Sequence, residues 1–225
     1  KYIKAQIDSI LNQSYPNVEL YVRDDGSKDG TLAIVREYEE KGLLHLEAGE
    51  NVGFVKSFEW LIANGGEADY YAFSDQDDVW ENDKVSVMLH RMKVLEKGLG
   101  SACPILLYSD MEVVDEELYE ISPSFASYTH QDPDRSSFAE LLVENQVTGG
   151  ASMINRALLM RCAKAPEVCC MHDWWIALTA SCFGIIEFMP RALSKYRQHG
   201  NNVLGAKNAG SFGEMKARLG RGKEV

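Results

Sequence analysis

Five acidic side chains follow an apolar run in one short stretch of the sequence, YYAFSDQDDVWENDK at residues 70–84. They are Asp75, Asp77, Asp78, Glu81 and Asp83. Like charges this close repel one another, so the crowding is costly unless a cation compensates it. Hard divalent cations such as Mg²⁺ bind carboxylate oxygens, typically one or two from the protein together with phosphates of a ligand. We therefore expect Asp75 and Asp77 to contact a metal ion or a ligand.

The start of a helix is the competing explanation for part of this cluster. A helix is expected over residues 81–97, and carboxylates near the N-terminus of a helix complement its macrodipole. We assign that role to Glu81 and Asp83. Asp75 and Asp77 instead come directly after an expected strand, which is a common position for a binding site.

A second polar motif, RDDGSKDG at residues 23–30, also follows an expected strand. Its glycine and serine residues suit a tight turn between a strand and a helix. The motif is not a Walker loop, and it lacks the GxGxxG spacing of dinucleotide-binding proteins. On the residues alone, a structural turn and a ligand-binding loop both stay open.

Two further motifs lie in the second half of the chain. In MHDWW at residues 171–175, Asp173 either caps a buried helix or supplies a carboxylate base. In TGGAS at residues 148–152, the glycines either let a ligand approach the backbone closely or mark a bend. A zinc site is not expected, because no usual zinc-ligand spacing fits the set Cys162, Cys169, Cys170 and His172.

Alternating strands and helices are expected to position these motifs in the first half of the chain. Strands are expected at residues 18–23, 43–48, 70–74 and 104–110, and helices at 2–14, 31–41, 54–64 and 81–97. The alternation predicts an α/β fold with parallel strands. Right-handed crossovers would bring loops 24–30, 49–53 and 75–80 to the carboxyl edge of the strands, where open α/β sheets bind ligands.

The second half of the chain has a less regular pattern. We expect an excursion from the sheet over residues 111–135. Helices are expected near 136–144 and 171–184, a strand-like segment at 146–155 and a strand at 185–190. After about residue 201 the sequence is rich in glycine and lysine, which favours a solvated tail or the start of a further segment.

Composition limits the classes of partner and compartment. The chain has 225 residues, of which 45% are apolar and 25% are charged, and its formal net charge is −11. This acidic balance argues against a protein that grips nucleic-acid phosphates. No uninterrupted apolar run is long enough to span a bilayer. The five cysteines form no disulfide framework, which suits a reducing cytoplasm.

Five motifs occur in the order found in family 2 glycosyltransferases. They are ILNQSYPNVELYVRDDGSKDGT, NVGFVKSFEWL, FSDQDDVW, HDWW and YRQHGNN. Each alone has little specificity, but together they resemble the family over about residues 2–205. The chain is similar to bacterial rhamnosyltransferase-like members. That resemblance implies the GT-A (Rossmann-like) fold, an α/β fold with a mixed, mainly parallel sheet flanked by helices.

The resemblance implies a nucleotide-sugar site in the first half of the chain. Asp25 would hydrogen-bond the pyrimidine base of the nucleotide, with Asp24 beside it. Lys56 would turn toward the diphosphate. In SDQDD, the DxD motif of the family, Asp75 would face the ribose and Asp78 is the optional third acid.

The resemblance also implies a metal site and a catalytic base. Asp77 and His199 would hold Mg²⁺ or Mn²⁺, and the cation would bind the donor diphosphate. Asp173 matches the catalytic base of the family, although His172 stands where many members have Glu. The residues implied to bind the acceptor are Gly149, Gly150 and Trp174.

The implied activity is a metal-dependent, inverting transfer of a sugar from a nucleotide diphosphate sugar to a hydroxyl group. The expected donor is dTDP-rhamnose or a UDP-sugar, and the expected acceptor is a saccharide or a lipid-linked molecule in cell-surface polysaccharide synthesis. The expected location is the cytoplasm, at the inner face of the membrane, with peripheral membrane association left open. Residues 1–110 would form the nucleotide-sugar half of one GT-A domain, 111–205 the acceptor and catalytic half, and 206–225 a tail or extension.

The sequence departs from the family at its first element. Family members begin with a strand that contacts the base, whereas Lys1 already lies in the helix that follows that strand. We therefore expect the first strand to be missing from the sheet. Two other functions stay open: a nucleotidyltransferase, which would release pyrophosphate, and a non-catalytic carbohydrate-binding remnant, which would bind sugar without a metal.

Overall fold

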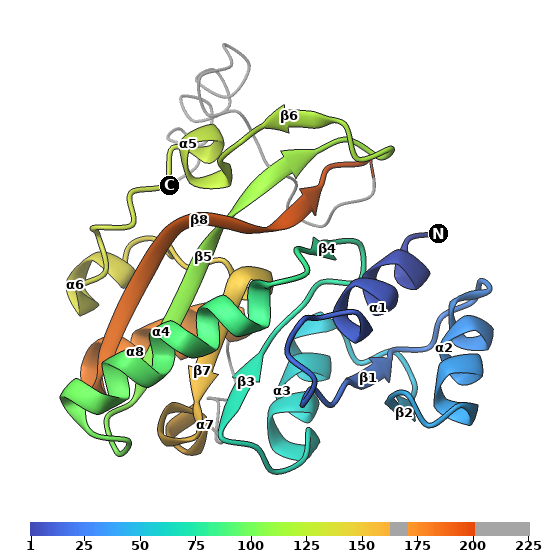
Figure 1. Cartoon of the computed structure of the whole chain (residues 1–225), viewed down its shortest axis with the longest axis horizontal. Coiled ribbons are helices and arrows are strands. Elements are labelled where there is room, and N and C mark those ends of the chain that lie inside the picture. Colours follow the sequence, from blue (N-terminus) through green and yellow to red (C-terminus); the bar gives the residue numbers. More distant parts are fainter. Residues whose placement is uncertain (163–170, 201–225) are drawn as a thin grey trace, which may run out of the picture.

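The computed structural model describes residues 1–162 and 171–200. In its first half, helices and strands alternate as predicted (Figure 1). The elements are α1 (Ile3–Leu11), β1 (Tyr21–Asp24), α2 (Thr31–Glu40), β2 (His45–Ala48), α3 (Phe54–Asn64), β3 (Tyr70–Ala72), β4 (Val79–Trp80) and α4 (Lys84–Leu99). Only the two-residue β4 has no counterpart in the sequence prediction.

The apolar spacing of the sequence explains the first helices. Helix α1 buries Ile3, Ile7 and Ile10, which recur on one face at helical spacing. Val35 of α2 packs into the same cluster, and Gly42 just after this helix has a φ of +68°. A left-handed residue at this position favours glycine and ends a helix.

The second half differs more from the prediction. Its elements are β5 (Ile105–Val114), β6 (Glu120–Ser122), α5 (Phe125–Thr129), α6 (Phe138–Leu141), the 3₁₀ turn η1 (Gly149–Ala151), β7 (Ser152–Asn155), α7 (Arg156–Cys162), α8 (His172–Phe183) and β8 (Ile185–Arg197). The expected excursion begins as a continuation of β5, and β8 runs well beyond the expected end at residue 190. Helix α7 was not predicted. The predicted tail, residues 206–225, lies outside the described residues.

The described strands form two sheets. Strands β1 and β2 make a small parallel sheet, and the larger sheet has the order β3–β7–β5–β8–β4 with β6 paired to β5. The predicted mixed sheet is confirmed, but its pairings differ from the mainly parallel pattern, since in the larger sheet only β5 and β8 pair in parallel. Strand β7 is the reason, because it inserts antiparallel between β3 and β5. The alternation of strands and helices therefore predicts that β3 and β5 run in the same direction. It does not predict that β7 lies between them.

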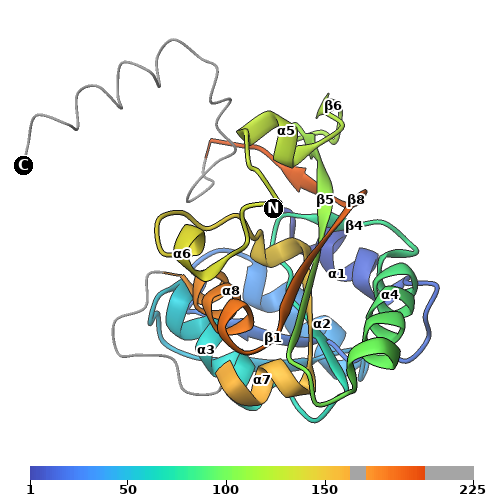
Figure 2. The same ribbon diagram turned by 90° about the vertical axis from the view of Figure 1, so that its left-hand side faces the viewer.

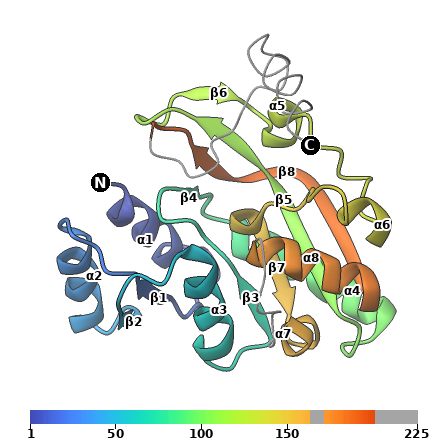
Figure 3. The same ribbon diagram turned by 180° about the vertical axis from the view of Figure 1, so that it is seen from behind.

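Helices cover both faces of the larger sheet (Figure 2). Ile105 and Leu107 of β5 pack with Met88 of α4, whereas Leu106 and Tyr108 pack with α8 on the opposite face. Successive side chains of a strand point to opposite faces, so β5 supplies both cores. Seen from behind, α8, α7 and β7 lie close together beside α3 (Figure 3).

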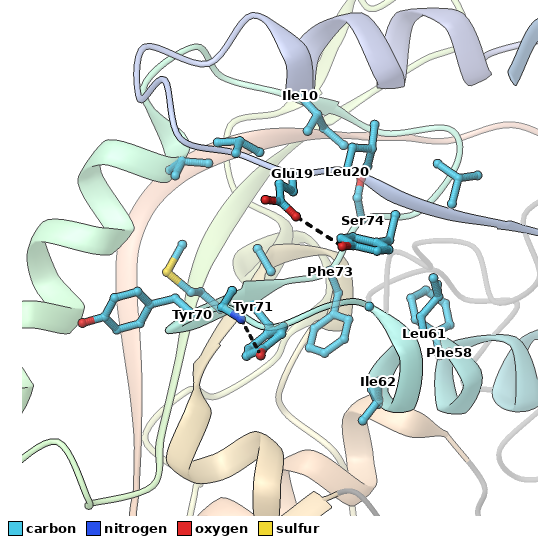
Figure 4. Close-up of a pocket in the computed structure, with 18 of the residues that line it drawn as sticks. Ile10, Glu19, Leu20, Phe58, Leu61, Ile62, Tyr70, Tyr71, Phe73 and Ser74 are labelled. Carbon is cyan, nitrogen blue, oxygen red and sulfur yellow. Dashed lines mark hydrogen bonds between the residues drawn. The ribbon is translucent and has the colours of Figure 1, made fainter. Parts of the chain in front are cut away.

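A cavity separates the two sheets. Strands β1 and β3 do not pair, and a space of about 750 Å³ lies between residues of both strands. Leu20, Tyr71 and Phe73 border it together with Ile10 of α1 and Phe58 of α3 (Figure 4). Neighbouring strands of one sheet are about 4.8 Å apart, whereas β1 and β3 belong to separate sheets with this cavity between them.

Candidate active site

Two of the loops expected to lie together, residues 24–30 and 49–53, are in contact. Asp25 accepts hydrogen bonds from the backbone N–H groups of Val52 and Gly53, each over 2.9 Å, and also pairs with Arg23. Burial alone would raise the pKa of Asp25, but these donors hold it below its ordinary value. Asp24 accepts bonds from the backbone of its own loop. Both carboxylates therefore fix the loops, and neither contact tests the expected nucleotide role.

Lys56 and Asp75 occupy different surroundings. Lys56 is exposed in the first turn of α3. Asp75 follows β3, and burial together with the negative charges of Asp77 and Asp173 raises its pKa to about 6. Asp75 thus lies close to the expected catalytic base, which the sequence places almost a hundred residues away.

The expected metal ligands lie side by side. Nε2 of His199 is 2.8 Å from Oδ2 of Asp77, and the exposed fractions of these side chains are 9% and 7%. Pairing of β4 with β8 creates this contact, because Val79 lies opposite Lys195 near the ends of both strands. Within residues 1–162 and 171–200, however, no set of three His, Cys, Asp or Glu side chains is arranged to hold a metal ion.

The neighbouring carboxylate, Asp78, supports the fit of a cation. Its Oδ1 accepts the backbone N–H of Arg197, but its buried Oδ2 has no hydrogen-bond partner in the described part of the chain. Burial, followed by the charges of Asp75 and Asp77, raises the pKa of Asp78 well above its usual value. An imidazole nitrogen and crowded carboxylate oxygens are suitable donors for Mg²⁺ or Mn²⁺.

Asp173 begins the first turn of α8 and faces the glycine turn, Gly149–Ala151. Its Oδ2 accepts the backbone N–H of Gly149 over 3.3 Å. Burial raises the pKa of Asp173 to about 6. A carboxylate with this pKa is ionised at neutral pH and basic enough to accept a proton from a positioned hydroxyl group.

The glycine turn has no room for side chains. A Cβ at Gly149 would lie 3.1 Å from Nε2 of His172 and 3.2 Å from Oδ2 of Asp173. A Cβ at Gly150 would lie 2.9 Å from Oδ2 of Asp75. The turn therefore lies between the expected base, Asp173, and a group of three carboxylates. We call this group, Asp75, Asp77 and Asp78, the acid motif.

The two tryptophans of the HDWW motif have structural contacts. The indole N–H of Trp174 donates to the carbonyl of Leu141, which ties α8 to α6. Trp175 packs against the core on this side of the sheet. The expected acceptor contact of Trp174 is not tested by these interactions.

Sequence reasoning assigned no role to two residues of this region, His172 and Lys84. The ring of His172 is buried and stacked on Phe58, its nitrogens have no hydrogen-bond partner among the described residues, and burial lowers its pKa to about 4. Lys84 is fully buried and donates to the carbonyl of Gly150. Its signal was present in the sequence, because Lys84 shares one helical face with the apolar Met88 and Met92 at a spacing of four residues.

No helix in the described part of the chain is both long and apolar enough to cross a membrane. Of the cysteines considered for zinc, Cys162 is buried in the core, and Cys169 and Cys170 lie outside the described residues.

Known proteins resemble the chain in sequence and in fold. It is 26% identical to the dTDP-rhamnosyl transferase RfbG of Shigella flexneri, over 97% of this chain and 75% of RfbG. It is 30% identical to the UDP-Glc:alpha-D-GlcNAc-diphosphoundecaprenol beta-1,3-glucosyltransferase WfaP of Escherichia coli, over 40% of this chain and 36% of WfaP. The mannosyltransferase PcManGT of Pyrobaculum calidifontis, solved with GDP-Man and Mn²⁺, superposes with a TM-score of 0.60 and 16% identity.

The matched region is part of a longer protein in each of these three cases. The superposition on PcManGT covers 90% of this chain but 56% of PcManGT. At 16% sequence identity, this superposition shows a shared fold and nothing more. The model of the family named Glycosyl transferase family 2 matches residues 1–161. The prediction of a rhamnosyltransferase-like glycosyltransferase is thereby confirmed. The chain belongs to glycosyl transferase family 2 and has the GT-A fold.

Proposed function

We propose that this protein is a metal-dependent, inverting glycosyltransferase of cell-surface polysaccharide synthesis. It transfers a sugar from dTDP-rhamnose or a UDP-sugar to a hydroxyl of a saccharide or lipid-linked acceptor at the inner face of the membrane. The names of RfbG and WfaP support these two donor classes, and that of WfaP supports a lipid-linked acceptor. The proximity of Asp75 and Asp173 beside the glycine turn carries the proposal, because transfer needs donor and base within one reaction distance.

Asp173 is the base of the proposed reaction. Its carboxylate takes the proton of the acceptor hydroxyl while that oxygen forms a bond to C1 of the donor sugar. The bond from C1 to the diphosphate breaks on the opposite face, and its electron pair leaves with the nucleoside diphosphate. A carboxylate is required because the hydroxyl is a weak nucleophile until its proton is removed.

The first half of the chain holds the donor in this proposal. Asp24 and Asp25 contact the pyrimidine base of the donor nucleotide, Lys56 lies near its diphosphate, and Asp75 lies at its ribose. Asp77 and His199 would hold Mg²⁺ or Mn²⁺, which supplies positive charge to the departing diphosphate. Gly149, Gly150 and Trp174 belong to the acceptor side, in line with a division into residues 1–110 and 111–205.

Product analysis tests this function. The protein is incubated with Mn²⁺, a saccharide acceptor and either dTDP-rhamnose or UDP-glucose, and nucleoside diphosphate is quantified. A parallel reaction contains Mn²⁺, a sugar 1-phosphate and dTTP or UTP, and pyrophosphate is quantified there. Release of nucleoside diphosphate that Asp173→Asn lowers by about a thousandfold supports the proposal. Release of pyrophosphate in the parallel reaction instead indicates a nucleotidyltransferase. Sugar binding without metal and without release indicates a non-catalytic remnant.

A further inference from the structure

Lys84 is an ionisable side chain in a place where water cannot reach it, and burial lowers its pKa to about 7. Its exposed fraction is 0%. The ammonium group donates to the carbonyl oxygen of Gly150 over 2.9 Å and lies 4.2 Å from the centre of the Trp80 ring. An ammonium ion with so few neutral partners is expensive to bury, so a compensating negative charge is needed nearby.

That negative charge comes from the acid motif. Asp78 and Asp75 both attract the ammonium group of Lys84. The peptide of Gly150 lies among the same groups, because a Cβ there would be 2.9 Å from Oδ2 of Asp75 and 3.3 Å from Oδ2 of Asp78. Lys84 therefore connects the acid motif to the glycine turn by charge on one side and by a hydrogen bond on the other.

The turn continues this connection to the expected base. The residue before Gly150 is Gly149, whose backbone N–H donates to Oδ2 of Asp173. The carbonyl of Gly149 in turn accepts the hydroxyl of Ser152 over 2.7 Å. Two successive residues of the turn thus bind Asp173 and Lys84, and one peptide group lies between the two bonded groups.

We propose that Lys84 is a positioning residue of the active site, which holds the glycine turn so that Asp173 faces the acid motif at reaction distance. The inference rests on the proposed function for its kinetic consequences, but the tether itself is a property of the fold. Lys84 is fully buried, so it is not exposed to contact either substrate. Its loss should therefore lower the rate of the chemical step and leave donor binding in place.

The test compares Lys84→Met with Lys97→Met, which removes an exposed lysine from the last turn of the same helix. Circular dichroism checks that both variants fold. Amide hydrogen exchange by NMR reports on the N–H groups of Gly149 and Ala151, and Mn²⁺-dependent release of nucleoside diphosphate from dTDP-rhamnose or UDP-glucose reports on kcat and KM. For Lys84→Met we expect exchange at the turn to accelerate about tenfold or more. We also expect kcat to fall about a hundredfold with little change in the KM for the donor.

Each outcome has a defined meaning. If Lys84→Met leaves exchange at Gly149 unchanged, or leaves kcat unchanged, the proposal is overturned. It is also overturned if the KM for the donor rises about a hundredfold, because the lysine would then act on donor binding. If Lys84→Met does not fold, exchange is read in Lys84→Met/Asp78→Asn, which removes the lysine together with a buried carboxyl group that attracts it, and protection of Gly149 equal to that in Asp78→Asn alone overturns the tether. If the unmodified protein releases no nucleoside diphosphate, the proposed function fails, while exchange at the turn still decides the tether.

Discussion

Nε2 of His199 lies 2.8 Å from Oδ2 of Asp77, although 122 positions separate the two residues in the sequence. The ring of Tyr2 stacks on that of His199 with centroids 5.0 Å apart, which fixes the orientation of the imidazole. These two expected metal ligands are held together with little exposure to water, which suits the cation proposed for this site. The metal binding proposed for this pair leads to the first prediction.

Asp77→Asn should abolish metal-dependent nucleotide binding. The neutral amide keeps the shape of the side chain but loses the charge that a hard cation requires. In a thermal-shift assay with UDP or dTDP, the increase in melting temperature caused by Mn²⁺ should disappear, because only ligands that bind the folded state stabilise it.

Asp83→Asn is the matched control for that prediction. Asp83 lies in the same acidic stretch, but its partner is the exposed Arg191. Surface ion pairs contribute about 0–1 kcal/mol to stability, so this variant should keep the response to Mn²⁺. An equal response in Asp77→Asn and the unmodified protein would remove Asp77 from the metal site.

The pH dependence of turnover follows from Asp173. Burial raises its pKa to about 6, so the carboxylate is ionised above that pH and protonated below it. A base must be ionised to accept a proton, so the rate should fall as the pH falls, by about tenfold per pH unit well below the pKa. The measurement is kcat between about pH 5 and pH 8 at saturating donor and Mn²⁺.

Metal binding has to be measured across the same pH range, because Asp75 lies close to Asp173 and also has a pKa near 6. If the affinity for Mn²⁺ stays constant while kcat falls, the loss belongs to the base. A rate that is flat or rises as the pH falls would contradict a catalytic role for the Asp173 carboxylate.

The first half of the fold was largely predictable because its signals are local. Helix α3 has the predicted bounds, and α1, α2 and β2 differ from the expected ranges only at their ends. Strand neighbours were not predictable in the same way. The insertion of β7 between β3 and β5 is a contact between distant segments, and nothing within either segment records it.

The candidate site shows the same division. Motif order and the family resemblance identified Asp77, Asp173 and His199, and the structure brings Asp77 and His199 together. Lys84 was missed because its importance depends on a hydrogen bond to a peptide 66 residues away. The available signal was a lysine among the apolar residues of one helical face. That spacing indicates a buried lysine, and the structure shows that Lys84 is buried.

Asn155→Ala should destabilise the fold. The buried amide of Asn155 accepts the backbone N–H groups of Ile105 and Leu158 and donates to Glu96 and to the carbonyl of Cys103. Its removal leaves buried backbone groups without partners, and we expect a loss of about 3 kcal/mol in the free energy of unfolding. Urea denaturation measures this loss.

Asn64→Ala provides the comparison for Asn155. Among the described residues, the exposed side chain of Asn64 bonds only to the carbonyl of Trp60 in its own helix, so the change in stability should stay within about 0.5 kcal/mol. Similar losses in the two variants would mean that the amide of Asn155 does not link β5, β7 and α4 as its hydrogen bonds indicate.

Gly150→Ala should damage the site while leaving most of the fold intact. The added Cβ would lie 2.9 Å from Oδ2 of Asp75, closer than real Cβ atoms approach a neighbour, so the turn or the acid motif must move. A displacement of about 1 Å can cost a hundredfold in rate when it misaligns reacting groups. We expect kcat for nucleoside diphosphate release to fall by about that factor.

Gly98→Ala makes the same chemical change where space is open. Apart from the chain neighbours of Gly98 and the backbone of its own helix, no atom of the described residues lies within 4 Å of the added Cβ, and Gly98 is inside α4. Alanine in a helix interior is more stable than glycine by about 1 kcal/mol, so this variant should melt at a higher temperature and keep its activity. If Gly150→Ala also kept full activity, the glycine turn would tolerate movement, and close contact between this turn and the acid motif would not be a requirement of the reaction.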